Sequence, residues 1–306
     1  MEPIESSTPE QGNSTDGRLA FVFAGGGSLG AVQVGMLLAL TEFGIRPDLV
    51  IGSSVGAINA AYYSACPTSE GVQRLATFWI GLRRADVFPL APLQGALGAL
   101  NRRNSLLSSS ALRAVIAHAI PFRDLSEAVI PCHVVATDAI SGEAVVLSTG
   151  DPVDVLLAST AIPAIFPPVA IDGRLLLDGA VGNTTPIALA VALGASRVVV
   201  LPTGFSCAAI APPAGALGML LHSASLMTMR QLHTDIVRVS SGPAHVVSVP
   251  PICPLKVSAY DFSHATTLIE RSHRATQEWL DAGGLEQRDV SMALLPHGHS
   301  LLQAGN

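Results

Sequence analysis

The sequence has few charged residues, only one lysine and no long uninterrupted hydrophobic run. Charged residues make up 13% of the 306 residues, Lys256 is the sole lysine, and the formal net charge is -6. This acidic balance argues against nucleic acid as the main partner. The most apolar stretches, residues 31–40 and 155–171, are too short or too interrupted by proline to cross a bilayer. Because the mean hydropathy is nevertheless +0.47, we expect a large buried core.

Cysteine is also scarce, and its spacing is uninformative. The four cysteines Cys66, Cys132, Cys207 and Cys253 lie far apart without any C-x-x-C pair. They are therefore expected to be reduced thiols, neither a disulfide framework nor a metal site. Residues 1–17 are polar and lack the basic and apolar regions of a signal peptide, which predicts a disordered tail. We accordingly expect a cytoplasmic protein, with peripheral contact at the inner membrane face.

Strand and helix patterns alternate from the start of the chain. Residues 19–24 and 48–51 are short apolar runs typical of buried strands, and each is followed by a glycine-containing turn and a helical pattern. This order predicts an α/β fold with a mostly parallel central sheet sandwiched by helices. A single domain is expected over residues 18–284, followed by a C-terminal tail at 285–306. Within the domain, residues 69–120 are helical and loop-like, and they are the candidate cap or lid over a site.

A tight turn follows the second predicted strand. Gly52-Ser-Ser-Val-Gly56 matches the pattern G-x-S-x-G in the strand–turn–helix setting that a nucleophile elbow requires. Its glycines allow the strand and helix backbones to approach closely. Ser54 then presents its hydroxyl at a helix N-terminus, whose unpaired N–H groups favour a developing oxyanion. The alternative is a Gly/Ser turn without chemistry.

The loop after the first predicted strand is rich in glycine. Gly25-Gly-Gly-Ser-Leu-Gly30 fits the dinucleotide fingerprint G-x-G-x-x-G. That fingerprint also needs an acidic residue at the end of the second strand, whereas Asp48 stands at its beginning. A nucleotide-binding module is therefore the weaker interpretation. Beside a nucleophile elbow, the backbone N–H groups of Gly25, Gly26 and Gly27 are instead expected to form an oxyanion hole.

A nucleophilic serine needs a base. Asp178 ends the apolar run 174–177 and precedes Gly179, so its carboxylate is the simplest candidate. The alternative is a Ser-His-Asp triad esterase. In α/β-hydrolases, however, the elbow follows several strands, whereas here it follows the second. The candidate histidines of such a triad are His222, His233 and His245.

Four segments occur together in an order and spacing that resemble the patatin-like phospholipase family. They are 25–30, 52–56, 158–168 and 178–180, and the resemblance spans residues 19–205. It implies a three-layer α/β/α fold and a catalytic dyad of Ser54 and Asp178, with no cofactor or metal. It also implies an oxyanion hole at the glycine loop. The supporting glycines of these motifs are Gly30, Gly52, Gly56 and Gly179.

The expected function is hydrolysis of lipid acyl esters through an acyl-enzyme, as in phospholipase A, lysophospholipase or esterase reactions. A catalytically inactive scaffold of this fold is disfavoured because both catalytic positions are intact. One position departs from the family. Leu29 stands where a basic residue is usual, which predicts a preference for neutral over anionic lipids. The sequence predicts no oligomeric state.

Overall fold

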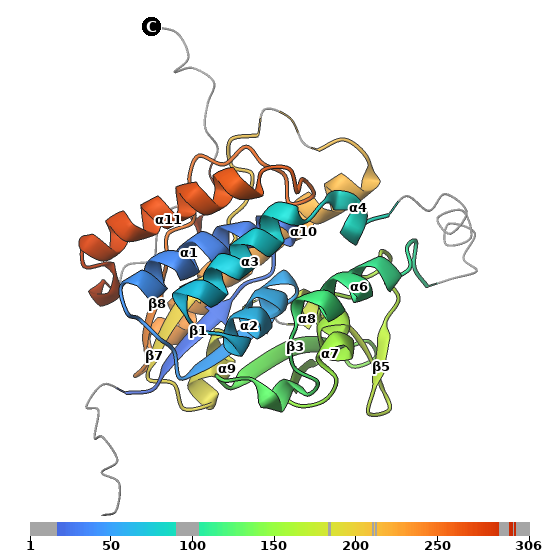
Figure 1. The fold of residues 1–306 in the computed structure, drawn as a ribbon, viewed down its shortest axis with the longest axis horizontal. Coiled ribbons are helices and arrows are strands. Elements are labelled where there is room, and N and C mark those ends of the chain that lie inside the picture. Colours follow the sequence, from blue (N-terminus) through green and yellow to red (C-terminus); the bar gives the residue numbers. More distant parts are fainter. Residues whose placement is uncertain are drawn as a thin grey trace, which may run out of the picture.

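The structure is a computed structural model. It describes residues 17–89, 104–182, 185–209, 211, 213–287, 294–295 and 297. Most of the two predicted tails, 1–17 and 285–306, lies outside these residues. So does the segment 90–103 in the middle of the predicted lid. Figure 1 shows the described part as a sheet covered by helices.

The described strands form one eight-stranded sheet in the order β5-β6-β3-β2-β1-β7-β8, with β4 paired to β3. Neighbouring strands among β1, β2, β3, β7 and β8 are parallel, and the pairings of β4, β5 and β6 are antiparallel. The predicted mostly parallel sheet is confirmed. The strand bounds are β1 Leu19–Phe23, β2 Leu49–Ser53, β3 Cys132–Asp138, β4 Ala144–Leu147, β5 Val169–Ile171, β6 Arg174–Asp178, β7 Arg197–Leu201 and β8 His245–Ser248.

The central strands β1 and β2 are buried along their whole length because helices cover both faces of the sheet. β1 and β2 are buried at every residue, as expected for parallel strands between two helical layers. The helix bounds are α1 Gly30–Glu42, α2 Val55–Ala65, α3 Ser69–Gly81, α4 Arg84–Val87, α6 Ser110–Ala119, α7 Pro152–Ser159, α8 Gly179–Gly182, α9 Ile187–Ala192, α10 Ala216–Ser240 and α11 Ala265–Asp281.

One helical layer is formed by α1, α2, α3 and α11, which contact one another (Figure 1). α9 packs on β7 and β1, and α10 packs on α9 and β8. Since the β1–β2 and β7–β8 crossovers run in opposite directions along the sheet, right-handed connections place their helices on opposite faces. The three-layer α/β/α arrangement is confirmed. None of the helices among the described residues combines the length and apolar content needed to span a bilayer.

The register of the sheet brings three chain segments to one edge. β1 and β2 are parallel neighbours, so the loops after Phe23 and Ser53 leave the same edge. β3 separates β2 from β6, with Ser53 paired to Val135 and Asp178 paired to Ala136. Because β6 is antiparallel to β3, it runs toward this level of the sheet and ends there. Asp178 therefore reaches the carboxyl edge of β2 across one intervening strand.

Candidate active site

The turn between β2 and α2 holds Ser54 in an uncommon backbone conformation. Its φ is 54° and its ψ is -130°, a combination that L-residues rarely adopt. The flanking glycines make this turn sterically feasible. A Cβ atom on Gly52 would lie 2.5 Å from Ala57 Cα, and one on Gly56 would lie 2.5 Å from the Phe23 carbonyl oxygen. The sharp turn leaves the Ser54 side chain at the first residue before the helix, facing two pockets.

Ser54 and Asp178 are in direct contact. The Ser54 hydroxyl donates to Asp178 Oδ2 at 2.7 Å, and the Ala180 N–H donates to Asp178 Oδ1 at 2.8 Å. Asp178 is only 3% exposed. Burial raises the pKa of this carboxyl to about 6, and its two hydrogen bonds offset part of that rise. The carboxylate is thus ionised at neutral pH yet more basic than an exposed aspartate.

Two hydroxyl side chains hold this pair in place, and neither is assigned a role by the sequence motifs. Ser159 Oγ accepts the Ser54 N–H at 2.9 Å and donates to the Val135 carbonyl at 2.6 Å, which links the turn to β3. Thr137 Oγ1 donates to the Asp178 carbonyl at 2.8 Å and accepts the Gly182 N–H at 2.9 Å. Ser159 lies within the segment 158–168 that carries the family resemblance. The motif therefore marked its position, although the sequence alone did not assign its role in holding the Ser54 turn.

The glycine loop lies against the Ser54 turn. A Cβ atom on Gly25 would approach Ser54 Cβ to 3.3 Å, and Gly27 lines both pockets that reach Ser54. Gly27 has a φ of +58°, which favours glycine. Within the described chain, the N–H groups of Gly25, Gly26 and Gly27 donate no hydrogen bond. These N–H groups are therefore available to an external acceptor.

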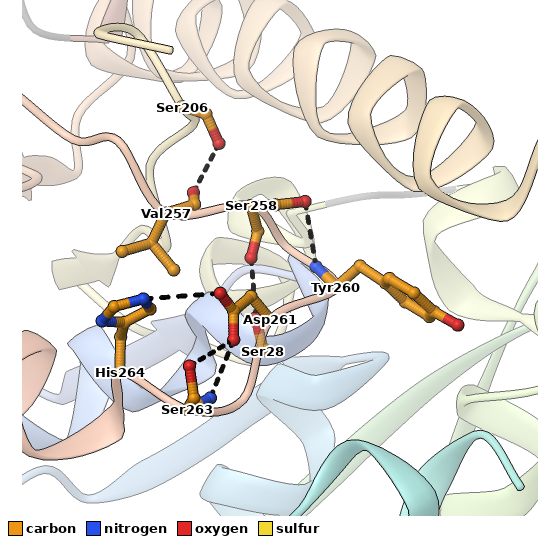
Figure 2. Close-up of polar contacts among 8 residues, drawn as sticks. All are labelled: Ser28, Ser206, Val257, Ser258, Tyr260, Asp261, Ser263 and His264. Atoms are coloured by element: carbon orange, nitrogen blue, oxygen red, sulfur yellow. Dashed lines mark hydrogen bonds and ion pairs between the residues drawn. The ribbon is translucent and has the colours of Figure 1, made fainter. Parts of the chain in front are cut away.

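Neighbouring groups fix the loop on both sides. Thr203 Oγ1 donates to the Gly25 carbonyl at 2.8 Å. The N–H of Ser28 donates to the Ala259 carbonyl at 2.9 Å. The Ser28 hydroxyl donates to the Ser258 carbonyl at 3.0 Å (Figure 2). The segment before α11 thus forms the rear support of the loop. The other supporting glycines, Gly30 and Gly179, pack closely on Val55 and Val135.

A buried network of amide side chains lies below the loop. Gln33 Nε2 donates to the carbonyl groups of Ala24 and Leu201, both at 2.8 Å. Asn59 Nδ2 donates to Gln33 Oε1 and to the Gly30 carbonyl, and Asn59 Oδ1 accepts from Trp79 Nε1 at 2.8 Å. Gln33 and Asn59 are fully buried. Because each amide group has partners, the network holds both ends of the glycine loop without leaving a buried polar group unsatisfied.

Two pockets meet at Ser54 and Gly27. The first is narrow, with a volume of about 60 Å³, and its lining is almost wholly apolar. Its side chains come largely from α2, α3, α4 and α6, and they include Ile58, Trp79 and Val115. The second pocket is wider, about 450 Å³, and is lined by Asp178, α8 and one side of α10. The predicted lid segment 69–120 therefore lines the narrow pocket, while its opening and closing stay a prediction.

The candidate histidines of the alternative triad lie elsewhere. His245 is the first residue of β8, at the opposite edge of the parallel sheet from Ser54, and its Nε2 contacts the Leu285 carbonyl at 2.8 Å. His222 and His233 lie within α10, and neither lines a pocket that reaches Ser54. In the described chain no histidine is hydrogen-bonded to Ser54 or Asp178. The triad interpretation gains no support.

The positions of Asp48 and Leu29 bear on two further interpretations of the sequence. Asp48 accepts the Leu19 N–H at 2.7 Å at the start of the strands, so it cannot serve a nucleotide at the glycine loop. The position of Leu29 removes the basis for the predicted preference for neutral lipids. Leu29 is fully buried in the hydrophobic core and lines neither pocket. Among the described residues, the group suited to hold a metal ion is Cys207, Cys253 and His297, none of which lines these pockets.

The fold and the site define an α/β protein in which a serine and a carboxylate pair at the carboxyl edge of a parallel sheet. The family model described as patatin-like phospholipase matches residues 21–191. The chain belongs to the patatin-like phospholipase family, a family of lipid hydrolases.

Relatives are similar over this region. Patatin-like phospholipase domain-containing protein 7 of Rattus norvegicus is 27% identical over 192 residues, covering 62% of this chain and 14% of that protein. An uncharacterized NTE family protein of Mycobacterium bovis is 29% identical over 187 residues, covering 61% of this chain and 49% of that protein. The match thus spans about half or less of these relatives' length. Human GIVD cytosolic phospholipase A2 has a similar fold, with a TM-score of 0.51 and 12% identity, over 91% of this chain and 60% of that one.

Proposed function

We propose that the protein hydrolyses carboxylic esters of lipids with Ser54 as the nucleophile and Asp178 as the base. The observation that carries this proposal is the 2.7 Å hydrogen bond from Ser54 Oγ to Asp178 Oδ2 where two pockets meet. Family membership supports the reaction class. The raised pKa of Asp178 supports the role of base, because a base works best when its pKa approaches the working pH.

In the first half-reaction, Ser54 Oγ attacks the acyl carbonyl carbon while Asp178 accepts the hydroxyl proton. The tetrahedral intermediate collapses, the ester C–O bond breaks, and the leaving alcohol takes the proton from Asp178. In the second half-reaction, Asp178 deprotonates a water molecule that attacks the acyl-enzyme. The fatty acid then leaves and the proton returns to Ser54. No cofactor enters either half-reaction.

The oxyanion of both intermediates is stabilised by the glycine loop. The unpaired N–H groups of Gly25, Gly26 and Gly27 lie beside Ser54. The N-terminal end of α2, which Ser54 precedes, adds the partial positive charge of the helix dipole. Loss of one such donor typically costs about 10²–10³ in kcat. The support of this loop by Ser258, Ala259 and the buried amides keeps the donors preorganised.

The two pockets suit the two parts of a lipid ester. The narrow pocket has the apolar lining that an acyl chain needs, and its volume of about 60 Å³ must widen to hold more than a few methylene groups. The wider pocket beside Asp178, of about 450 Å³, has room for the leaving alcohol. At the rim of the wider pocket, Met227 and Val181 are 72% and 54% exposed. Exposed apolar side chains at a pocket mouth favour contact with a lipid surface, so we propose peripheral membrane contact at this rim.

A fluorophosphonate probe tests the nucleophile directly. We expect one adduct, located on Ser54 by peptide mass spectrometry, and no adduct in Ser54→Ala. Ser53→Ala is the matched control and should still be labelled, because the Ser53 side chain is fully buried. Turnover of p-nitrophenyl esters and then of phospholipids, lysophospholipids and glycerides defines the substrate. An adduct on Ser53, or active protein that the probe does not label, would contradict the proposal.

A further inference from the structure

Two cysteines and a histidine that are distant in sequence meet outside the catalytic pockets. Cys207 Sγ lies 3.7 Å from Cys253 Sγ across a separation of 46 residues, and Cys253 Sγ lies 3.1 Å from His297 Nε2 across 44 residues. All three ligand atoms lie within 4.8 Å of one another. The three residues come from the loop after β7, the segment between β8 and α11, and the chain after α11. Such separations explain why spacing along the sequence gave no sign of the cluster.

The geometry of the cluster is that of a metal site rather than of a disulfide. Two Zn–S bonds of about 2.3 Å at a tetrahedral angle place their sulfur atoms about 3.8 Å apart. The observed sulfur separation is 3.7 Å, whereas a disulfide needs about 2.05 Å. On the same grounds, the imidazole nitrogen would withdraw from Cys253 Sγ by about 0.5 Å on binding the metal.

The groups around the cluster orient its ligands. His297 Nδ1 lies 2.7 Å from the Leu295 carbonyl oxygen, which can only accept a hydrogen bond. Nδ1 therefore carries the proton in the neutral imidazole, and the lone pair of Nε2 faces the sulfur atoms. The Leu255 N–H donates to Cys207 Sγ at 3.3 Å, a contact that would stabilise a thiolate ligand. Both contacts are of the outer-shell kind that metal sites use.

We propose that Cys207, Cys253 and His297 bind one zinc ion. Two thiolates and one imidazole select zinc over the hard cations Mg²⁺ and Ca²⁺. Cys253 is exposed, so solvent reaches the cluster and water can fill the fourth position.

The zinc ion would fasten the segment that supports the glycine loop. Two hydrogen bonds join the chain around Cys207 to the chain that follows Cys253. Ser206 Oγ donates to the Val257 carbonyl, and the Ala208 N–H donates to the Leu255 carbonyl. A few residues further on, the Ser258 carbonyl accepts the Ser28 hydroxyl (Figure 2), and the Ala259 carbonyl accepts the Ser28 N–H. Cys207, Cys253 and His297 line neither catalytic pocket, so the metal would act on the support of the loop and would take no part in ester hydrolysis.

The test is zinc content of the full chain, prepared under reducing agent, loaded with Zn²⁺ and freed of excess metal. We expect about one zinc per chain by mass spectrometry of the metal. Cys207→Ser, Cys253→Ser and His297→Ala should each weaken zinc binding at least tenfold in competition with a chelator, since even outer-shell losses cost about 10–100-fold. Cys66→Ser is the matched control, because Cys66 lies outside the cluster, and it should keep the metal.

Cobalt substitution identifies the ligands independently of enzyme activity. The wild type and Cys66→Ser should show thiolate-to-cobalt charge-transfer absorption, and Cys253→Ser should lose most of it. Because Cys253 is exposed, this variant keeps the core intact even if the buried Cys207→Ser fails to fold. The proposal is wrong if the loaded wild type retains only background amounts of zinc, or if folded Cys253→Ser binds zinc as tightly as the wild type. It is also wrong if Cys207 and Cys253 form a disulfide in protein kept under reducing agent.

Discussion

Burial of the Asp178 carboxylate should lower the stability of the protein at neutral pH. The pKa of Asp178 is raised to about 6 in the folded chain by burial, above its ordinary value of 3.8. Between about pH 4 and pH 6 the folded chain therefore binds more protons at this group than the unfolded chain. Stability contributed by this group falls as pH rises through that window. Asp178→Asn removes the charge, so the variant should gain stability relative to the wild type over the same window.

The size of the effect follows from the pKa. At about 1.4 kcal/mol for each pKa unit, a rise from 3.8 to about 6 corresponds to about 3 kcal/mol. Since Asp178 is only 3% exposed, solvent screening takes little from this value. In return, kcat should fall by about 10²–10⁴, because an amide cannot accept the Ser54 proton. For the wild type, kcat/KM should rise with pH through about 6 as Asp178 ionises.

Urea unfolding of wild type and Asp178→Asn at several pH values between 4 and 8 measures this difference. The stability of the variant minus that of the wild type should rise by up to about 3 kcal/mol up to pH 7 and then level off. Asp138→Asn is the matched control, because hydrogen bonds from the Ser141 and Ile140 N–H groups lower the pKa of Asp138. Its difference should stay nearly constant between pH 4 and pH 8, because a lowered pKa changes the stability only below the ordinary value of 3.8. A pH-independent difference for Asp178→Asn would refute the argument.

Three further predictions concern the site. The triad alternative requires one essential histidine, whereas the dyad requires none. Under the dyad, His222→Ala, His233→Ala and His245→Ala should each keep most of the activity. A folded histidine variant as inactive as Ser54→Ala would contradict the dyad. Val115→Phe should fill the narrow pocket and lower kcat/KM for long-chain esters more than for short-chain ones. Ala114→Phe, at an exposed position on the same helix, should not. An equal ratio of long-chain to short-chain kcat/KM in the two variants would exclude this pocket as the acyl site. Met227→Glu should reduce flotation with liposomes. Val237→Glu, at a position that is 51% exposed on α10 against 72% for Met227 and that does not line the pocket, should not, and equal loss of binding in both variants would place the membrane contact elsewhere.

The sequence was sufficient to predict the sheet and the pairing of Ser54 with Asp178. Parallel strands place their carboxyl ends at one edge, so glycine-containing turns after consecutive strands must come together there. The expected contact between Ser54 and Asp178 is observed at 2.7 Å, although its catalytic role stays a prediction. Local motifs were enough for the two turns because each one combines a strand end with a turn. The family resemblance implied the pairing with Asp178, which the antiparallel strand β6 carries.

Other parts of the site depend on contacts that no local pattern encodes. Gln33 and Asn59 lie inside helical patterns, where an amide has no evident partner until α1, α2 and α3 pack together. Leu29 was misplaced for a related reason. Gly26 and Gly27 of the same loop line the wider pocket, but the 3₁₀ turn at Gly27–Leu29 directs the Leu29 side chain into the core. Periodicity gives no direction for a residue in so short an element.

The position of β3 between the two strands that carry Ser54 and Asp178 has a consequence for synthesis of the protein. The two residues are 124 positions apart, and Asp178 reaches Ser54 only when β2, β3 and β6 are all paired. β7, the second neighbour of the central strand β1, follows later still. A chain emerging from the ribosome therefore carries Ser54 for a long interval without its partner carboxylate. Under the proposed mechanism, an unfinished chain cannot cleave the lipids it meets, and lipid-cleaving activity becomes a direct report that the sheet has closed around β3.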